Sequence, residues 1–374
     1  MTTYQVDLFR VPMRGPGDLS GLHKLIAEGQ LDPRDIVAIL GKTEGNGCVN
    51  DFTREYASKT FAAALASYLG CTASEIESRV ALVMSGGTEG VLSPHASIFA
   101  RRAVAAKQGA GKRLAVGVAH TRDFLPEELG RRAQVEETAK AVRAAMEEAG
   151  IDDVKDVHFV QIKCPLLTAE RVEQALARGK TPVTDDPYGS MAFSRGASAL
   201  GVAVALGEIP PDVKEESILT DWGLYSTTAS TSAGIELLQN AVVVMGNAEA
   251  AAGDTVIGHA VMEDAIDLRG VMAAFRSVGI DAGVGLSQED SDRVVNVFAK
   301  AEASPDGKVR GFRHTMLDDS DINSTRHARG AVGGLIAAVA GNGAIYVSGG
   351  AEHQGPAGGG PIAVVARVGS EWVA

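Results

Sequence analysis

One pattern occurs three times along the chain, and it limits the folds that the chain can adopt. Three apolar runs rich in β-branched residues each end on a lysine: IVAILGK at Lys42, VHFVQIK at Lys163 and VVNVFAK at Lys300. Each run has the composition of a buried strand, and the lysine stands where the strand ends. Self-similarity over so long a period predicts repeated copies of one α/β unit.

Each lysine is followed by an arginine that opens an Ala- and Gly-rich stretch of helical composition. The arginines are Arg54 in FTREYASKTFAAALASYL, Arg195 in FSRGASALGVAVAL and Arg329 in ARGAVGGLIAAVAG. Arg326 lies just before the third stretch, so the residues alone leave two candidates in that copy. We expect a helix to begin near the arginine in each copy.

A short glycine-containing loop that begins with serine completes each copy. The loops are SGGTEG from Ser85, SAGIEL from Ser232 and SGGAEH from Ser348, and a strand-like run follows each. All three fit the pattern S-[GA]-G-x-E. In the middle copy Ser230 lies two residues before Ser232, so it is an alternative to the serine that the alignment selects.

Composition narrows the setting and the partners of these units. Polar turns with glycine divide the chain into predicted units at residues 1–110, 111–252 and 253–374. The formal net charge of -12 argues against nucleic acid or an anionic membrane as the main partner. There is no apolar stretch of membrane-spanning length, and the three cysteines suit neither a disulfide framework nor a zinc site. We therefore expect a cytoplasmic protein.

The repeated residue types suit catalysis on a small ligand with several carbonyl groups. Serine hydroxyls and backbone N–H groups that converge from three loops are the components of an oxyanion hole, and a triazine trione would match their threefold symmetry. A serine needs a base to become a nucleophile, and a buried lysine near arginines has a lowered pKa that suits this role. In a single copy, the lysine would be interpreted as a solvated charge, the serine as a turn residue and the arginine as part of a surface ion pair. Three copies in one order favour a site.

Cofactor motifs are weak in this sequence. GKTEGNG lacks the residue order of a phosphate-binding loop, and the pattern of an organic cofactor site is absent. The segment AEHQGPAGGGP offers many backbone carbonyls, and Glu302 follows Lys300 by two residues. These oxygens would suit a hard cation such as Mg²⁺ or Ca²⁺, although the residues alone favour an ordinary Gly/Pro turn.

Long motifs across the chain resemble one family. GKTEGNGCVNDFTREYA, VMSGGTEGVLSPH, HFVQIKCPLLT, VNVFAKAEASPDG, RHTMLDDSDINSTRHARG and YVSGGAEHQGPAGGGP are similar to the cyanuric acid hydrolase and barbiturase family of ring-opening amidohydrolases. The resemblance implies three structurally similar α/β units around a pseudo-threefold axis with one central active site. It also implies a cytoplasmic homotetramer without an organic cofactor, which hydrolyses the carbon–nitrogen bond of a cyclic amide. The reaction would open cyanuric acid to carboxybiuret, which loses CO₂ to give biuret in s-triazine breakdown.

The resemblance also assigns roles to residues. It implies that Lys163 is the catalytic base and Ser232 the nucleophile, while the pairs Lys42 with Ser85 and Lys300 with Ser348 bind and polarise the other carbonyls. The implied substrate contacts are Arg54, Ser85, Gly86, Arg195, Ser232, Ala233, Arg329, Ser348 and Gly349. The implied structural metal site, for Mg²⁺ or Ca²⁺, comprises Glu302 with carbonyls of Ala351, Gln354, Gly355, Pro356 and Gly359.

Two alternatives follow from the same residues. A barbiturase would act on barbituric acid, which has a CH₂ group where cyanuric acid has an N–H. A non-catalytic protein that binds cyclic imides would keep the pocket without the chemistry. We favour cyanuric acid because INSTRHARG and the C-terminal half resemble that branch of the family.

Overall fold

Three mixed β-sheets form the centre of the chain, in a computed structural model that describes residues 3–105, 111–283 and 285–369. The first sheet comprises β1 (Tyr4–Pro12), β2 (Ile36–Thr43), β3 (Ala81–Gly86), β4 (His95–Ala103) and the short β9 (Ala251–Ala252). The second comprises β5 (Arg113–His120), β6 (Val157–Pro165), β7 (Ala229–Gly234) and β8 (Ala241–Ala248). The third comprises β10 (Thr255–Met262), β11 (Val294–Ala301), β14 (Tyr346–Gly349) and β15 (Gly360–Arg367).

The three sheets have the same strand order. The orders are β3-β2-β4-β1, β7-β6-β8-β5 and β14-β11-β15-β10, with β9 added to the edge of the first sheet. In each sheet the lysine strand pairs in parallel with the serine strand and antiparallel with its other neighbour. The parallel pair needs a crossover, which the intervening helices supply. The predicted boundary at residues 110 and 111 falls at residues 106–110, outside the described part of the chain.

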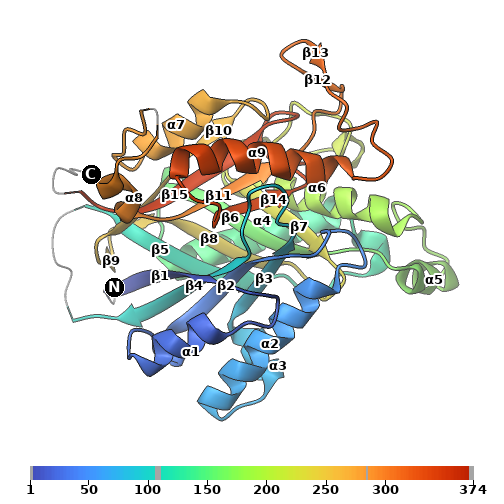
Figure 1. Ribbon diagram of the computed structural model, residues 1–374. Helices are drawn as coiled ribbons and strands as arrows, with labels where there is room; N and C mark the ends of the chain where they lie inside the picture. The colour runs from blue at the N-terminus through green and yellow to red at the C-terminus, as the bar shows by residue number, and fades with distance from the viewer. Residues whose placement is uncertain (1–2, 106–110, 284, 370–374) are drawn as a thin grey trace.

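Helices cover the outer faces of the sheets (Figure 1). The first sheet packs on α1 (Ser20–Ala27), α2 (Phe52–Leu69) and α3 (Ala73–Arg79), and the second on α4 (Arg132–Ala149) and α6 (Pro187–Ala205). The third packs on α7 (Leu268–Arg276) and α9 (Ser324–Ala340). The remaining elements are peripheral: α5 (Ala169–Ala177), α8 (Gln288–Arg293), β12 (Lys308–Val309) and β13 (Phe312–Arg313).

The inner faces of the sheets share one apolar core. Phe99 from the first sheet, Phe159 from the second, and Phe298 and Tyr346 from the third lie in it. The ring centroids of Phe298 lie 6.2 Å from Phe99, 5.8 Å from Phe159 and 5.7 Å from Tyr346. Buried aromatic contacts of this kind stabilise the junction by hydrophobic burial and edge-to-face attraction. The core therefore fixes the three sheets against one another just beneath the site.

Two details of the sequence prediction are wrong. The serines were expected to begin loops, but Ser85, Ser232 and Ser348 lie within β3, β7 and β14, before each chain turns. Arg54 lies in the first turn of α2, as expected, whereas Arg195 lies in the middle of α6. In that copy the helix begins earlier, with Asp186 as its N-cap and Pro187 as its first residue. Among the described residues no helix is both long enough and apolar enough to cross a membrane.

Candidate active site

Nine of the eleven residues predicted to bind substrate line one small central cavity, and the other two, Lys42 and Lys300, are absent from its lining. Its walls include Arg54, Ser85, Gly86, Arg195, Ser232, Ala233, Arg329, Ser348 and Gly349, together with Gly47 and Met191. The fold therefore brings together predicted residues that lie up to 295 positions apart in the sequence, from Arg54 to Gly349. The cavity measures only about 20 Å³, whereas sites for small molecules usually measure about 300 Å³ or more. The three arginines belong to its lining, and each is held by carbonyls or by a carboxylate.

Strand alternation explains why the lysines and serines converge. Leu40 points into the shared core, so Lys42, two residues later on the same strand, lies on the same face. The same alternation places Lys300 two residues after Phe298 and Lys163 four residues after Phe159, so each lysine shares a face with a residue of the shared core. Each lysine stands opposite a serine in the parallel register: Lys42 with Ser85, Lys163 with Ser232 and Lys300 with Ser348.

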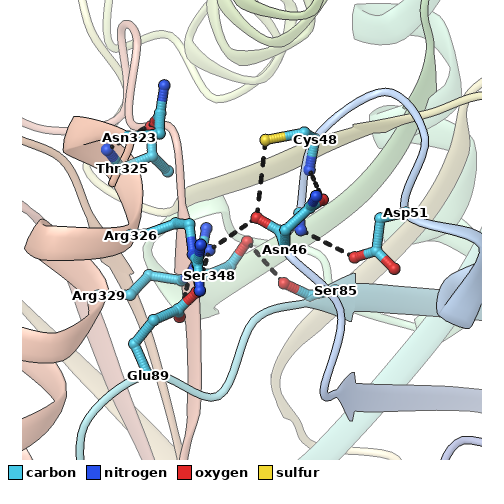
Figure 2. Close-up of polar contacts among 12 residues, drawn as sticks. Asn46, Cys48, Asp51, Ser85, Glu89, Asn323, Thr325, Arg326, Arg329 and Ser348 are labelled. Carbon is cyan, nitrogen blue, oxygen red and sulfur yellow. Dashed lines mark hydrogen bonds and ion pairs between the residues drawn. The ribbon is translucent and has the colours of Figure 1, made fainter. Parts of the chain in front are cut away.

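The first and third lysines contact their own serines. The Lys42 amine lies 3.1 Å from Ser85 Oγ, and the Lys300 amine lies 3.2 Å from Ser348 Oγ. Lys300 also donates to the carbonyls of Thr231 and Gly349, at 2.8 and 2.9 Å. Ser85 Oγ in turn donates to Ser348 Oγ at 3.2 Å, a bond visible in Figure 2. These two pairs therefore form one connected polar network.

The middle pair is arranged differently. Lys163 donates to the Met84 carbonyl at 2.7 Å and forms an ion pair with Glu236 at 3.0 Å. Ser232 Oγ is buried and has no hydrogen-bond partner within the described residues. An unsatisfied buried hydroxyl is costly, so such a group commonly has a functional reason. Ser230, the alternative nucleophile, instead donates to Gln161 Oε1 at 2.7 Å.

The sequence prediction missed three glutamates, although the final E of S-[GA]-G-x-E marks their positions. Glu89 accepts two hydrogen bonds from Arg329, each of 2.7 Å, and Glu352 accepts two from Arg195, of 2.7 and 2.6 Å. Figure 2 shows the Glu89 carboxylate directed toward Arg326 and Arg329, and Arg326 also bonds it at 3.1 Å. Bidentate pairs of this kind hold a guanidinium in a fixed plane.

The third glutamate, Glu236, pairs with a lysine instead of an arginine. The corresponding arginine, Arg54, donates to the backbone carbonyls of Ala233 and Cys48 at 2.9 and 2.7 Å. The second glycine position of the motif also contacts different groups in different units. A Cβ at Gly87 would overlap the guanidinium of Arg329, whereas one at Gly234 would overlap the Glu236 carboxylate. Both positions therefore require glycine, because the guanidinium approaches the backbone at one and the carboxylate approaches it at the other.

Burial and neighbouring charges set the pKa of each lysine. Burial lowers the pKa of Lys42 and Lys300 well below its ordinary value, and the nearby charges of Arg329 and Arg195 respectively lower it further. Burial also lowers the pKa of Lys163, but the Glu236 carboxylate opposes that effect. Lys163 is therefore the lysine whose charged form has a direct carboxylate partner among the described residues.

The residues predicted to hold a metal lie at the side of the central cavity. Glu302 and Ala351 line a neighbouring cavity of about 450 Å³. The Glu302 carboxylate accepts hydrogen bonds from Ala303 N at 2.8 Å and Thr325 Oγ1 at 2.9 Å. Gln354, Gly355, Pro356 and Gly359 lie in the loop between β14 and β15. In the described part of the chain there is no group of three or more His, Cys, Asp or Glu side chains that would hold a metal, so the carbonyls would be needed.

Comparison with known proteins supplies the context for this geometry. A family described as amidohydrolase ring-opening protein matches residues 7–367. The chain is 62% identical over 370 residues to a cyanuric acid amidohydrolase of Bradyrhizobium diazoefficiens, covering 98% of this chain and 100% of that protein. It is 60% identical over 366 residues to the cyanuric acid amidohydrolase of Pseudomonas sp. strain ADP, covering 97% of this chain and 99% of that protein.

Solved structures are similar over the same length. A cyanuric acid hydrolase described as an innovation by structural concatenation has a TM-score of 0.94 and 60% identity, covering 98% of this chain and 100% of that chain. The cyanuric acid hydrolase of A. caulinodans has a TM-score of 0.89 and 50% identity, covering 98% and 99%. The mixed α/β architecture is thus the one found in these hydrolases.

Proposed function

The chain belongs to the family of ring-opening amidohydrolases and is a hydrolase of cyclic amides, and we propose that its substrate is cyanuric acid. The product of ring opening would be carboxybiuret, which loses CO₂ to give biuret. The observation that carries the proposal is the cavity in which three serines, one from each sheet, meet three arginines from the helices α2, α6 and α9. The identity of 62% to a protein named cyanuric acid amidohydrolase supports the choice of substrate.

A pseudo-threefold arrangement is part of the same proposal. Three units, residues 1–110, 111–252 and 253–374, would stand around an axis through the central cavity. The shared strand order and the shared Lys–Ser register support this arrangement. Each unit would then present one serine and one arginine to one carbonyl group of a trione ring.

Lys163 and Ser232 form the proposed catalytic dyad. Uncharged Lys163 would take the proton from Ser232 Oγ, which attacks a ring carbonyl carbon, and the resulting ammonium would protonate the ring nitrogen as the C–N bond breaks. Water would then release the acyl group from Ser232, with Lys163 again moving the proton. The free Ser232 hydroxyl supports this assignment, because the other two serines already bond their lysines.

The remaining pairs would bind the two carbonyls that do not react. Ser85 and Ser348 accept hydrogen bonds from Lys42 and Lys300, and bound substrate would draw their hydroxyl groups toward these two carbonyls as donors. Substrate would enlarge the cavity, and the guanidinium groups in its lining would then surround the ring. Lys163 would reach Ser232 by a rotation of its side chain, because the two residues are partners in the parallel register and paired strands lie only about 4.8 Å apart.

A structural divalent cation fits the Glu302 region. Glu302 has no ion-pair partner among the described residues, and burial, with Glu352 nearby, raises its pKa. A hard cation would offset this negative charge, with Glu302 and carbonyls of Ala351, Gln354, Gly355, Pro356 and Gly359 as its proposed ligands. Bound there, Mg²⁺ or Ca²⁺ would fix the loop after β14. The homotetramer and the cytoplasmic location stay predictions, the first of which light scattering would check.

The substrate is tested by comparing hydrolysis of cyanuric acid with that of barbituric acid. We expect ring opening of cyanuric acid and slow or absent turnover of barbituric acid. Turnover of barbituric acid alone would identify a barbiturase. Binding of either ring without turnover would identify the non-catalytic alternative, and calorimetry distinguishes it from a protein that binds neither.

A further inference from the structure

A second cavity reaches the proposed base from outside the substrate site. It measures about 590 Å³, and both Lys163 and Glu236 line it. The residues that line the central cavity are a separate set, which includes neither of these two side chains. The titratable and hydroxyl groups that join them in the second cavity are Glu55, Ser58, Lys59, Ser74, Glu77, His120 and Asp123.

This cavity connects a buried floor with an exposed rim. The Lys163 side chain is 1% exposed, and the Glu236 side chain, next to it, is 10% exposed. Lys59 and Asp123 at the rim are exposed to solvent. Both carboxylate oxygens of Glu236 are buried and, apart from the ion pair with Lys163, have no polar partner among the described residues. Glu236 therefore lies beside the amine of the proposed base in the lining of the second cavity.

A buried hydroxyl indicates that the cavity is hydrated. Ser58 is 8% exposed, and its Oγ has no hydrogen-bond partner among the described residues although it lines the cavity. A buried hydroxyl is normally satisfied, and in a polar cavity of this size water is the available partner. Water that bonds Ser58 would belong to a hydrated path to the floor.

We infer that Lys163 exchanges its proton with bulk solvent through Glu236 and the water of this second cavity, and not through the substrate site. The inference rests on the proposed function. It assigns Glu236 the role of a proton-relay residue that acts through Lys163. Lys42 and Lys300 have no such ion pair within the described chain, so the relay belongs to the middle unit.

The proton balance of the reaction requires an exit. Hydrolysis adds the hydroxyl of water to the carbonyl carbon and its hydrogen to the ring nitrogen, and the carboxylic acid that forms then ionises. One proton per turnover must leave a central site that has almost no free volume. The Lys163 amine takes this proton and becomes an ammonium, and the Glu236 carboxylate accepts it as a carboxylic acid. Water in the second cavity then carries the proton away and leaves the pair ready for another turnover.

The charges that face Lys163 stabilise its ammonium on the side of the second cavity. Burial raises the pKa of Glu236, but the charges of Lys163 and Arg54 lower it overall, so its carboxylic acid would pass the proton on to water. Arg54 disfavours the ammonium from the substrate side, whereas Glu236 favours it from the side of the second cavity. Cys164, its chain neighbour, is uncharged because burial raises the pKa of its thiol. The other titratable groups around the path are Glu55, Lys59, Glu77, His120 and Asp123.

The test is chemical rescue in three matched variants, Glu236→Gln, Glu89→Gln and Glu352→Gln. Loss of a proton relay should lower kcat of Glu236→Gln about 100-fold with little change in KM, since general acid–base groups contribute about that much or more. Added formate, small enough to enter the second cavity, should restore part of kcat. Glu89→Gln and Glu352→Gln should raise KM instead, because they release substrate-binding arginines, and formate should not rescue them.

A further change tests the route itself. Ser74→Trp places a large side chain at an exposed position of the cavity wall, and in the Glu236→Gln background it should abolish the rescue by formate. Rescue that persists with the wall blocked would overturn the route, as would failure of formate to rescue Glu236→Gln. If the unaltered protein fails to open cyanuric acid, the proposed function itself is wrong.

Discussion

The middle unit differs from the other two in what its glutamate binds. In the first and third units the motif glutamate holds an arginine of another unit, as Glu89 holds Arg329 and Glu352 holds Arg195. In the middle unit Glu236 holds Lys163, and Arg54 is bound by backbone carbonyls. The same strand order thus occurs with two kinds of Lys–Ser pair. In two units the lysine bonds its serine, whereas in the middle unit the serine is unbonded and the lysine forms an ion pair with a glutamate. The difference teaches that units with the same strand topology differ in their side-chain partners, and the proposed catalytic copy is the one with the different partners.

The largest expected effect is the loss of activity when the proposed nucleophile or base of the middle unit is replaced. Ser232→Ala and Lys163→Ala should each lower kcat by at least about 1000-fold, and the double variant should lose little more, because both act in one proton-transfer unit. Ser85→Ala and Ser348→Ala remove a hydrogen bond to a carbonyl that does not react, so kcat/KM should fall only about 10-fold to 100-fold. Steady-state kinetics on the four single variants would make the comparison. Equal losses at all three serines would contradict it.

The next effect concerns the arginine–glutamate pairs. Arg329→Met leaves the buried Glu89 without its bidentate partner, so the free energy of unfolding should fall by about 3 kcal/mol. Glu89→Gln in the same chain removes the stranded charge and should recover most of that loss. Urea unfolding of the two single variants and the double variant measures this coupling. Additive losses would mean that the two residues do not interact.

A smaller effect concerns the pH dependence of activity. Lys163 must be uncharged to act as a base, so kcat/KM should fall at acid pH with a limb set by its lowered pKa. Glu236 raises that pKa, so the residual activity of Glu236→Gln should show a limb moved to lower pH. Glu352→Gln serves as the control and should leave the limb in place. A limb that moves to higher pH would contradict the sign of the Glu236 effect.

The lysines also give stability a defined dependence on pH. Their pKa is lower in the folded chain than the value of about 10.4 expected in the unfolded chain, so the unfolded chain binds more protons between the two values. Their contribution to stability should therefore rise with pH through that window. Lys42→Met should flatten the rise of the unfolding free energy with pH. An unchanged slope would mean that Lys42 is charged in the folded chain.

The smallest effect separates the two serines of β7. Ser230 bonds Gln161 deeper in the sheet and does not line the central cavity, so Ser230→Ala should change kcat only a few-fold while stability falls by about 1 kcal/mol. Kinetics together with thermal unfolding would show this division. Loss of activity in Ser230→Ala, with activity kept in Ser232→Ala, would transfer the nucleophile to Ser230.

The sequence was sufficient to predict that the lysines and serines meet in pairs, but not which side chains the glutamates bind. Repetition predicted the lysines, serines and arginines, because residues at equivalent strand ends converge when equivalent units pack together. It placed Ser85 in a loop because the glycines that follow suggested that the strand had already ended. In the structure β3 continues through Ser85 to Gly86. It also missed Glu236 as the partner of Lys163, because that pairing depends on where Arg54 lies in three dimensions.

The central claim is that Ser232, and not Ser85 or Ser348, attacks the substrate. A crystal structure with bound barbituric acid tests this most directly, because the ring should occupy the central cavity. We expect Ser232 Oγ to face a carbonyl carbon with the Lys163 amine within hydrogen-bonding distance, while Ser85 and Ser348 donate to carbonyl oxygens. A ring carbon facing Ser85 or Ser348 instead, with Ser232 bonded only to an oxygen, would contradict the account.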